Sequence, residues 1–226
     1  MRPRPALRPR RPLRPITLAY HAIHEPQPGV AAPDVIDAPA TLERDVRALL
    51  ATGYRIVTAG ELAAETGGAR PADGTALLTF DDGWRDGLTV AAPLLARLGV
   101  RGTFFVCPGL FGNHDVRLGE AGRVLSAAEA RELHAAGMEL GAHSLTHPDL
   151  RVLGDAELRG ELTGSREAVE AITGEPCLAF AYPFGVHDAR VRRAVARAGF
   201  AVAFQYAPGR WSRLAAPRLP APYVPG

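Results

Sequence analysis

Short apolar runs alternate with amphipathic stretches along most of the sequence, and this alternation is what most constrains the fold. Seven runs have the length and composition of strands, and stretches with apolar residues at helical spacing follow them. The predicted strands cover residues 16–21, 55–58, 75–80, 102–106, 138–143, 177–182 and 201–205. Strands that alternate with helices form parallel sheets, so we expect an α/β protein, either a β/α barrel or a doubly wound sheet.

Capping residues mark several of the helix boundaries. Thr58 with Glu61, and Ser126 with Glu129, match the capping box, in which two side chains satisfy backbone N–H groups at a helix start. Asp155 is the expected cap of the longest helix. These boundaries support the division into strands and helices.

The first 15 residues differ in composition from the rest. They hold six Arg, five Pro and no acidic residue, whereas the remaining residues carry 20 Arg against 24 Asp and Glu. An Arg/Pro run cannot bury a core, so residues 1–15 are predicted to be a disordered tail; an arm for nucleic acid or an anionic membrane is the alternative. We expect a single domain over residues 16–220 and a C-terminal tail over 221–226, with residues 215–225 extended.

The cellular location of the protein can be inferred from targeting signals and from the cysteines. No apolar segment follows the N-terminal arginines as in a secretory signal, and no apolar run approaches the ~20 residues of a membrane span. Cys107 and Cys177 lack metal-ligand spacing and are expected to be buried free thiols, which favours a reducing compartment. We therefore expect a cytoplasmic protein without a nucleic-acid partner, with an extracellular or cell-envelope location as the alternative if the start is mis-assigned.

Every one of the 26 basic residues is arginine. The absence of lysine excludes a Walker A phosphate loop, a Schiff-base lysine and a pyridoxal phosphate anchor.

Chemically active residues follow the carboxyl ends of the predicted strands. His21 ends the first strand, Asp81 and Asp82 follow the third, and His143 ends the fifth, with His147 four residues later. Because the carboxyl ends of parallel strands meet at one rim, we expect these side chains to be neighbours. Two imidazoles and a carboxylate form a ligand set typical of a catalytic zinc or a related divalent ion.

Each of these groups also has a simpler interpretation. Asp81 and Asp82 precede a glycine and could form a solvated turn, while His143 and His147 could be a packed core histidine and a helix cap. Their common position at strand ends favours the metal site. Ser144 stands where HExxH metalloproteases have the glutamate that serves as general base, so the base must come from elsewhere, and Asp81 is the candidate. We expect Asp81 to be unligated and to face solvent.

Three motifs, TFDDG (79–83), HSLTH (143–147) and YPFG (182–185), resemble those of the polysaccharide deacetylases of carbohydrate esterase family 4, the NodB homology domain. The resemblance covers about residues 16–220. It implies a distorted (β/α)7 barrel and a metal-dependent hydrolase that removes N-acetyl groups from amino sugars in a polysaccharide or glycoconjugate. The implied cofactor is one divalent ion, with Zn²⁺ expected and Co²⁺, Ni²⁺ or Fe²⁺ as alternatives.

The resemblance also implies roles for individual residues. Asp81 matches the general base, and the metal ligands would be Asp82, His143 and His147. The turn Pro183, Phe184 and Gly185 would present the Phe184 backbone N–H to the oxyanion, and Ser144 and Leu145 would hold the metal loop.

Two features depart from the family pattern. Ala181 stands where the third motif usually begins with arginine, and no histidine after His187 could supply the usual general acid. The early LAYHAI stretch resembles the branch that includes bacterial poly-N-acetylglucosamine deacetylases, which implies that His21 is the acid; a structural role is the alternative. Trp84 and Trp211 could stack on a sugar, although packing is the expected role.

Two other functions stay open at this point. The chain could deacylate a small or lipid-linked amino sugar or another amide, since Ala181 could reflect a reshaped pocket. It could also be a metal- or glycan-binding relative without turnover, although a binder has no need of Asp81. The sequence carries no signal of oligomeric state.

Overall fold

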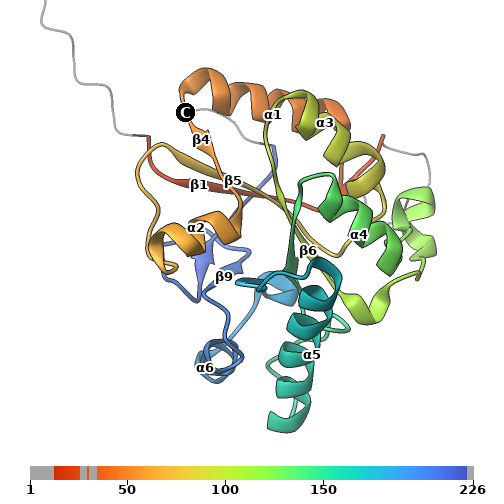
Figure 1. Ribbon diagram of the computed structural model, residues 1–226, viewed down its shortest axis with the longest axis vertical. Coiled ribbons are helices and arrows are strands. Elements are labelled where there is room, and N and C mark those ends of the chain that lie inside the picture. The colour runs from red at the N-terminus through yellow and green to blue at the C-terminus, as the bar shows by residue number, and fades with distance from the viewer. Residues whose placement is uncertain (1–12, 26–29, 31–34, 223–226) are drawn as a thin grey trace, which may run out of the picture.

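Nine of the strands in the described residues form one parallel sheet that curls into a barrel, and the helices lie around its outside (Figure 1). The computed structural model describes residues 13–25, 30 and 35–222. The barrel strands, in chain order, are β1 (Ile16–Tyr20), β4 (Arg55–Ile56), β5 (Thr75–Phe80), β6 (Thr103–Val106), β7 (Glu139–Ala142), β8 (Ala179–Ala181), β9 (Val202–Gln205), β10 (Ala216–Pro217) and β11 (Leu219–Pro220). Around the sheet their order is β10, β9, β8, β7, β6, β5, β1, β11, and β4 pairs with the first residues of β5.

Two short strands near the C-terminus join the two edges of this sheet. β10 pairs with β9, β11 pairs with β1, and Arg218 is the one residue between them. The segment 216–220 therefore closes most of the gap between the first and the last long strand. Of the two arrangements that the alternating pattern allows, the nearly closed barrel is confirmed, and all seven predicted strands belong to it.

Both faces of the barrel strands are buried. In β5, Leu77 packs in one cluster with Phe105 and Phe204, whereas Leu78 and Phe80 pack in a second cluster that includes helix residues. A strand buried on both faces is apolar at nearly every position, which explains why the run 75–80 shows no polar alternation.

The helices begin and end largely where capping residues predict. They are α1 (Pro39–Thr52), α2 (Ala59–Thr66), α3 (Ala92–Arg97), α4 (Ala127–Ala135), α5 (Asp155–Thr173) and α6 (Ala189–Arg197). The capping boxes at Thr58 and Ser126 are confirmed, each with its glutamate bonded to the N-cap backbone.

The predicted cap of α5 is wrong by one residue. The N-cap is Gly154, and Asp155 is the first helical residue. The carboxylate of Glu157 accepts the Gly154 N–H (2.9 Å), so the helix start is already satisfied, and the Asp155 carboxylate instead pairs with Arg190 (2.9 Å).

A long connection between β6 and α4 lies beside the carboxyl end of the barrel. It contains two 3₁₀ turns, Pro108–Leu110 and Val116–Gly122. The Leu125 N–H donates to the Gly83 carbonyl (2.9 Å), and the Arg85 N–H donates to the Arg123 carbonyl (2.7 Å). These bonds fix residues 108–125, here called the rim segment, to the chain that follows β5.

Smaller elements complete the described chain. A separate parallel pair consists of β2 (Ala22–Ile23) and β3 (Ile36–Asp37), and a π-helical turn, Gly87–Ala91, leads into α3. Cys107 and Cys177 are buried and free, as expected. None of the helices in the described ranges has the length and apolar character that crossing a membrane requires.

The domain boundaries stay predictions. Residues 1–12 and 223–226, which make up most of the two predicted tails, lie outside the described residues. Residues 216–220 are extended, as the sequence indicates for the C-terminal segment.

Candidate active site

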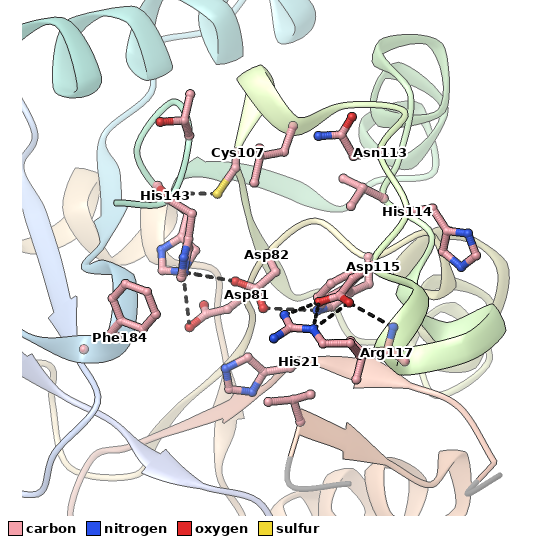
Figure 2. Close-up of a pocket in the computed structure, with 18 of the residues that line it drawn as sticks. His21, Asp81, Asp82, Cys107, Asn113, His114, Asp115, Arg117, His143 and Phe184 are labelled. Carbon is pink, nitrogen blue, oxygen red and sulfur yellow. Dashed lines mark hydrogen bonds and ion pairs between the residues drawn. The ribbon is translucent and has the colours of Figure 1, made fainter. Parts of the chain in front are cut away.

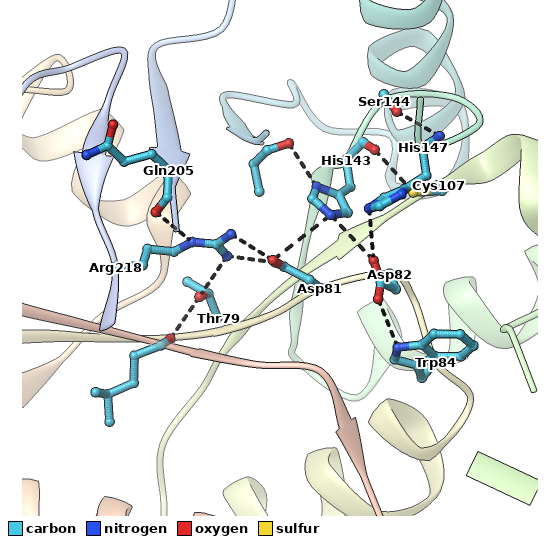
Figure 3. Close-up of polar contacts among 12 residues, drawn as sticks. Thr79, Asp81, Asp82, Trp84, Cys107, His143, Ser144, His147, Gln205 and Arg218 are labelled. Atoms are coloured by element: carbon cyan, nitrogen blue, oxygen red, sulfur yellow. Dashed lines mark hydrogen bonds and ion pairs between the residues drawn. The ribbon is translucent and has the colours of Figure 1, made fainter. Parts of the chain in front are cut away.

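The structure brings together the residues that the sequence places at the strand ends. Oδ1 of Asp82 lies 3.5 Å from Nε2 of His143 and 3.3 Å from Nε2 of His147. One ligand atom from each of these three residues lies within 4.8 Å of the other two. Figure 2 shows Asp82 and His143 beside Asp81, and Figure 3 shows that His147 points toward the same place.

The spacing of these atoms fits a tetrahedral metal site. Zinc bonds of about 2.0–2.2 Å to nitrogen and oxygen place the ligand atoms of a tetrahedron roughly 3.3–3.6 Å apart. The two distances from Asp82 Oδ1, 3.5 and 3.3 Å, agree with that separation. Three protein ligands leave a coordination position open, which is the arrangement of catalytic rather than structural zinc sites.

The backbone carbonyl of Ala181 fixes the orientation of His143. It lies 2.8 Å from Nδ1 of the imidazole and can only accept a hydrogen bond, so Nδ1 is the donor. Nε2 of His143 then carries the lone pair and faces Asp82. A metal-ligating histidine typically donates its second ring N–H in this way.

The loop that carries His147 has an unusual backbone. Ser144 and His147 both have positive φ angles, 63° and 60°, which non-glycine residues rarely adopt. The His147 N–H donates to Oγ of Ser144 (2.9 Å), which closes the turn. Ser144 therefore shapes the loop, as the resemblance implies.

Glu161 of α5 holds the same loop through hydrogen bonds, a role that no sequence motif indicates. Its carboxylate accepts the backbone N–H groups of Leu145 (2.8 Å) and Thr146 (2.9 Å) and the Thr146 hydroxyl (2.7 Å). The expected function of Leu145 in the loop thus depends on its backbone N–H. Spacing along the sequence could not pair residue 161 with a loop 15 residues earlier.

Asp81 is buried and ion-paired, so the expectation that it faces solvent is wrong. Only 4% of Asp81 is exposed, and both of its carboxylate oxygens accept hydrogen bonds of 2.7 Å from Arg218. Arg218 is itself fully buried and also donates to Thr79 Oγ1 (3.3 Å) and the Gln205 carbonyl (3.4 Å). An arginine is therefore present at the site, although it comes from residue 218 and not from the position of Ala181.

The charges around the site determine its protonation. Burial by itself would raise the pKa of Asp81, but the Arg218 guanidinium, with His143 and His21, holds that pKa well below its usual range. Burial also opposes ionisation of Asp82, and its pKa is lowered by His143 above all. Asp81 is thus a carboxylate at neutral pH, as a general base must be.

The two histidines differ in their surroundings. Burial disfavours the charged form of His143, yet Asp81 and Asp82 outweigh burial and raise its pKa. The pKa of His147 is lowered by burial and by the nearby His143, which favours the neutral form that binds metals.

A pocket of about 640 Å³ opens over these residues (Figure 2). His21, Phe184, Gly185 and Tyr206 line it on the barrel side, together with the predicted ligands and Asp81. The opposite wall is the rim segment, which contributes residues such as Asn113 and Arg117. The pocket therefore gathers every predicted site residue except Pro183.

His21 and Phe184 both line the pocket beside the predicted site residues. The His21 ring packs edge-on against Tyr206, with the centroids 5.8 Å apart, and its charge would act on both Asp81 and Asp82. The Phe184 ring packs edge-on against His147 at 4.6 Å and is 65% exposed. Phe184 has a positive φ of 57°, so the Pro183–Gly185 turn holds its backbone in a rare conformation beside the metal ligands.

Three side chains that could hold a metal ion, Asp82, His143 and His147, lie next to an ionised carboxylate at the carboxyl rim of a β/α barrel, where the active sites of such barrels lie. The sequence matches the family model for polysaccharide deacetylase over residues 68–203, which is more than half of the chain. The chain belongs to the polysaccharide deacetylase family. The resemblance based on TFDDG, HSLTH and YPFG is thereby confirmed.

Individual relatives agree with this assignment. YxkH of Bacillus subtilis, which is named as a polysaccharide deacetylase, is 24% identical over 162 residues, covering 71% of this chain and 55% of its own length. The chain therefore spans about half of that curated relative. The deacetylase PplD of Streptococcus pyogenes, solved in complex with acetate, is 25% identical and superposes with a TM-score of 0.78 over 93% of both chains.

IcaB from Ammonifex degensii has the same fold at lower identity. It is 19% identical, with a TM-score of 0.74, and the match covers 92% of this chain and 91% of IcaB. Together with PplD it confirms the NodB-type barrel.

Proposed function

We propose that this chain is a metal-dependent N-deacetylase that releases acetate from N-acetylated amino sugars of a polysaccharide or glycoconjugate. The observation that carries the proposal is the arrangement of Asp82, His143 and His147 around one point, with the ionised Asp81 beside them in the same pocket. Membership of the polysaccharide deacetylase family supports the substrate class.

Asp81 is the proposed general base. Its carboxylate lies 4.0 Å from Nε2 of His143, so it borders the ligand cluster without belonging to it. Arg218 keeps it ionised and fixes the plane of the carboxylate through two hydrogen bonds. Asp81 would take a proton from the water that attacks the amide carbonyl, a role that typically contributes 10²- to 10⁴-fold in rate.

The proposed cofactor is one divalent ion held by Asp82, His143 and His147, with Zn²⁺ favoured by the nitrogen, nitrogen and oxygen donors and by their spacing. When bound, such an ion would act as a Lewis acid toward the amide oxygen. Co²⁺, Ni²⁺ and Fe²⁺ accept similar donors and remain alternatives.

Two further groups would act on the reacting amide. The Phe184 backbone N–H lies in the turn next to His147 and would donate to the oxyanion as the carbonyl is attacked. His21 lines the pocket near Asp81 and Asp82 and would donate a proton to the departing amine nitrogen.

Metal content and acetate release together test the proposal. The purified chain should hold about one Zn²⁺, release acetate from N-acetylglucosamine oligomers, lose activity on chelation and regain it when Zn²⁺ is added back. Asp81→Asn should lower the rate by about 10²- to 10⁴-fold with metal content unchanged, whereas the surface variant Asp73→Asn should match the wild type. Acetate release that persists after complete removal of metal would exclude the mechanism.

A comparison of substrates identifies the class of amino sugar on which the enzyme acts. Free, lipid-linked and polymeric N-acetylhexosamines should be compared under the same conditions, and the polymer or its oligomers should give the highest kcat/KM. Metal and glycan binding without acetate release would instead support a binding protein.

A further inference from the structure

The indole of Trp84 makes a contact with a predicted metal ligand. Its Nε1–H donates to Oδ2 of Asp82 at 3.2 Å (Figure 3). The other oxygen of the same carboxylate, Oδ1, faces Nε2 of His143 and His147. The two oxygens of Asp82 therefore have different partners, one in the ligand cluster and one on the tryptophan.

We propose that Trp84 is a positioning residue that restricts Asp82 to a single metal-binding oxygen and thereby sets the affinity and coordination number of the site. A carboxylate can bind a divalent ion through one oxygen or through both. Asp82 Oδ2 must give up its hydrogen bond with Trp84 before it can turn toward the ion. Oδ1 alone then completes a three-ligand set with an open position.

The donor is held in place by the chain around it. Trp84 forms an isolated β-bridge with Val124, and the neighbouring backbone bonds from Leu125 to Gly83 and from Arg85 to Arg123 measure 2.9 and 2.7 Å. The indole also packs against a small buried cluster of Ala22, Leu118 and Ala121. The rim segment thus fixes both the backbone and the ring of Trp84.

The backbone of the ligand gives it little freedom to compensate. Asp82 has a φ of 70°, in the left-handed region, and only Gly83 separates it from Trp84 in the sequence. Gly83 also has a positive φ, 73°, and a Cβ there would lie 3.3 Å from Val106 Cγ1. The turn from Asp82 to Trp84 is therefore tightly constrained, and ligand and donor move as one unit.

This inference rests on the metal site of the proposed function. Trp84→Phe removes the N–H donor and keeps an aromatic ring, so it tests the hydrogen bond more than the packing. Trp211→Phe is a matched control, because the Trp211 indole also donates at 3.2 Å, to the Gly68 carbonyl, and lies outside the pocket. The readouts are the Zn²⁺ dissociation constant and the visible absorption of bound Co²⁺, both measured without substrate.

We expect Trp84→Phe to weaken Zn²⁺ binding by about 10- to 100-fold, as other hydrogen-bond partners of metal ligands do. Its Co²⁺ absorption should become weaker than that of the wild type, because four-coordinate Co²⁺ absorbs strongly and higher coordination numbers absorb weakly. Trp211→Phe should leave both quantities at the wild-type values.

The outcomes that contradict the positioning role differ from those that contradict the proposed function. An unchanged dissociation constant and spectrum in a folded Trp84→Phe variant would overturn the positioning role and leave the proposed function standing. If Trp84→Phe does not fold, Trp84→Leu serves instead, since it also lacks the N–H donor. A Zn²⁺ dissociation constant and a Co²⁺ spectrum equal to those of the wild type would then overturn the positioning role. Absence of metal binding by the wild type itself would overturn both proposals.

Discussion

Arg218 and Asp81 form a buried ion pair in which two guanidinium nitrogens each lie 2.7 Å from a different carboxylate oxygen. The two residues are 137 positions apart in the sequence. Arg218 stands between β10 and β11, the strands that join the edges of the barrel. The contact that keeps the proposed base ionised therefore depends on the closure of the barrel. The same ion pair should contribute both to the stability of the fold and to catalysis.

Removing the guanidinium should destabilise the fold and impair catalysis together. In Arg218→Gln the Asp81 carboxylate loses its buried counter-charge, which typically costs about 3–5 kcal/mol. Urea unfolding should show a free energy of unfolding lower by that amount, and acetate release should fall because the pKa of Asp81 rises. Arg218→Lys keeps a charge but loses the two parallel bonds, so it should lie between Arg218→Gln and the wild type.

A double variant separates the ion pair from other effects of the substitution. Arg218→Gln combined with Asp81→Asn removes both charges, so the loss of stability should be clearly smaller than the sum of the single losses. Additive losses would show that Arg218 stabilises the barrel by packing, for example over the Phe105 ring 5.7 Å away, and not through Asp81.

Glu161 should affect metal binding without touching the metal. Glu161→Ala removes the acceptor of three hydrogen bonds from the 145–146 part of the ligand loop, so His147 should lose its fixed position. We expect the Zn²⁺ affinity to fall by about 10- to 100-fold. Isothermal titration of the metal-free protein measures the change.

Glu157 provides the control for this effect. It lies on the same helix, α5, and its carboxylate accepts one backbone N–H, that of Gly154. Glu157→Ala should cost about 0.5–2 kcal/mol in stability, as the loss of a helix cap does, and leave the metal affinity unchanged. Equal losses of affinity in the two variants would show that general loosening of α5 is responsible.

The sequence predicts the architecture well because the fold depends on local patterns. The run 75–80 has no charged residue and is mostly apolar, and the structure has β5 over the same residues. The capping boxes at Thr58 and Ser126 can be recognised in the sequence because the two residues of each box lie only three positions apart. The N-cap of α5 is Gly154 and not the predicted Asp155, because glycine can also occupy an N-cap when a nearby glutamate accepts its N–H.

The parts of the site that the sequence did not reveal depend on long-range contacts. Arg218 and Glu161 bond to Asp81 and to the loop of His147 from distant parts of the sequence, and no motif spacing indicates either contact. The bond from Trp84 to Asp82 is local, but the indole is held in place by the distant rim segment. Asp81 was expected to face solvent because nothing in the sequence pairs residue 218 with it. Such contacts follow from how the barrel closes and how the rim segment packs, which a linear pattern does not encode.

The turn that carries Phe184 should tolerate no side chain at Gly185. Gly185 has a φ of 68°, and a Cβ there would lie only 2.5 Å from the backbone nitrogen of Tyr206. Gly185→Ala should therefore lower both stability and acetate release, as measured by thermal unfolding and kcat. Gly174→Ala is the control for backbone strain alone, because Gly174 has a φ of 73° and open space around a Cβ. This substitution should lower the free energy of unfolding by about 1–2 kcal/mol and leave kcat unchanged.

Asp86 should make stability depend on pH in a defined window. The residue is buried, and no donor in the described residues forms a hydrogen bond of good geometry with either carboxylate oxygen. Burial raises the pKa of Asp86 to about 6, although the Ile23 backbone and His24 partly oppose it. The folded state thus binds this proton more tightly than the unfolded chain, in which the pKa of Asp86 is near 3.8. The stability that the bound proton contributes is therefore lost as the pH rises from about 4 through 6.

Asp86→Asn removes that dependence, since the amide does not titrate. A difference of about two pKa units corresponds to about 3 kcal/mol, so the stability of Asp86→Asn relative to the wild type should improve by about 2–3 kcal/mol between pH 4 and pH 7.5. Comparing the two proteins at each pH by urea unfolding cancels the titration of every other group. A relative stability of Asp86→Asn that stays constant from pH 4 to 7.5 would mean that the Asp86 carboxyl titrates alike in the folded and unfolded chain.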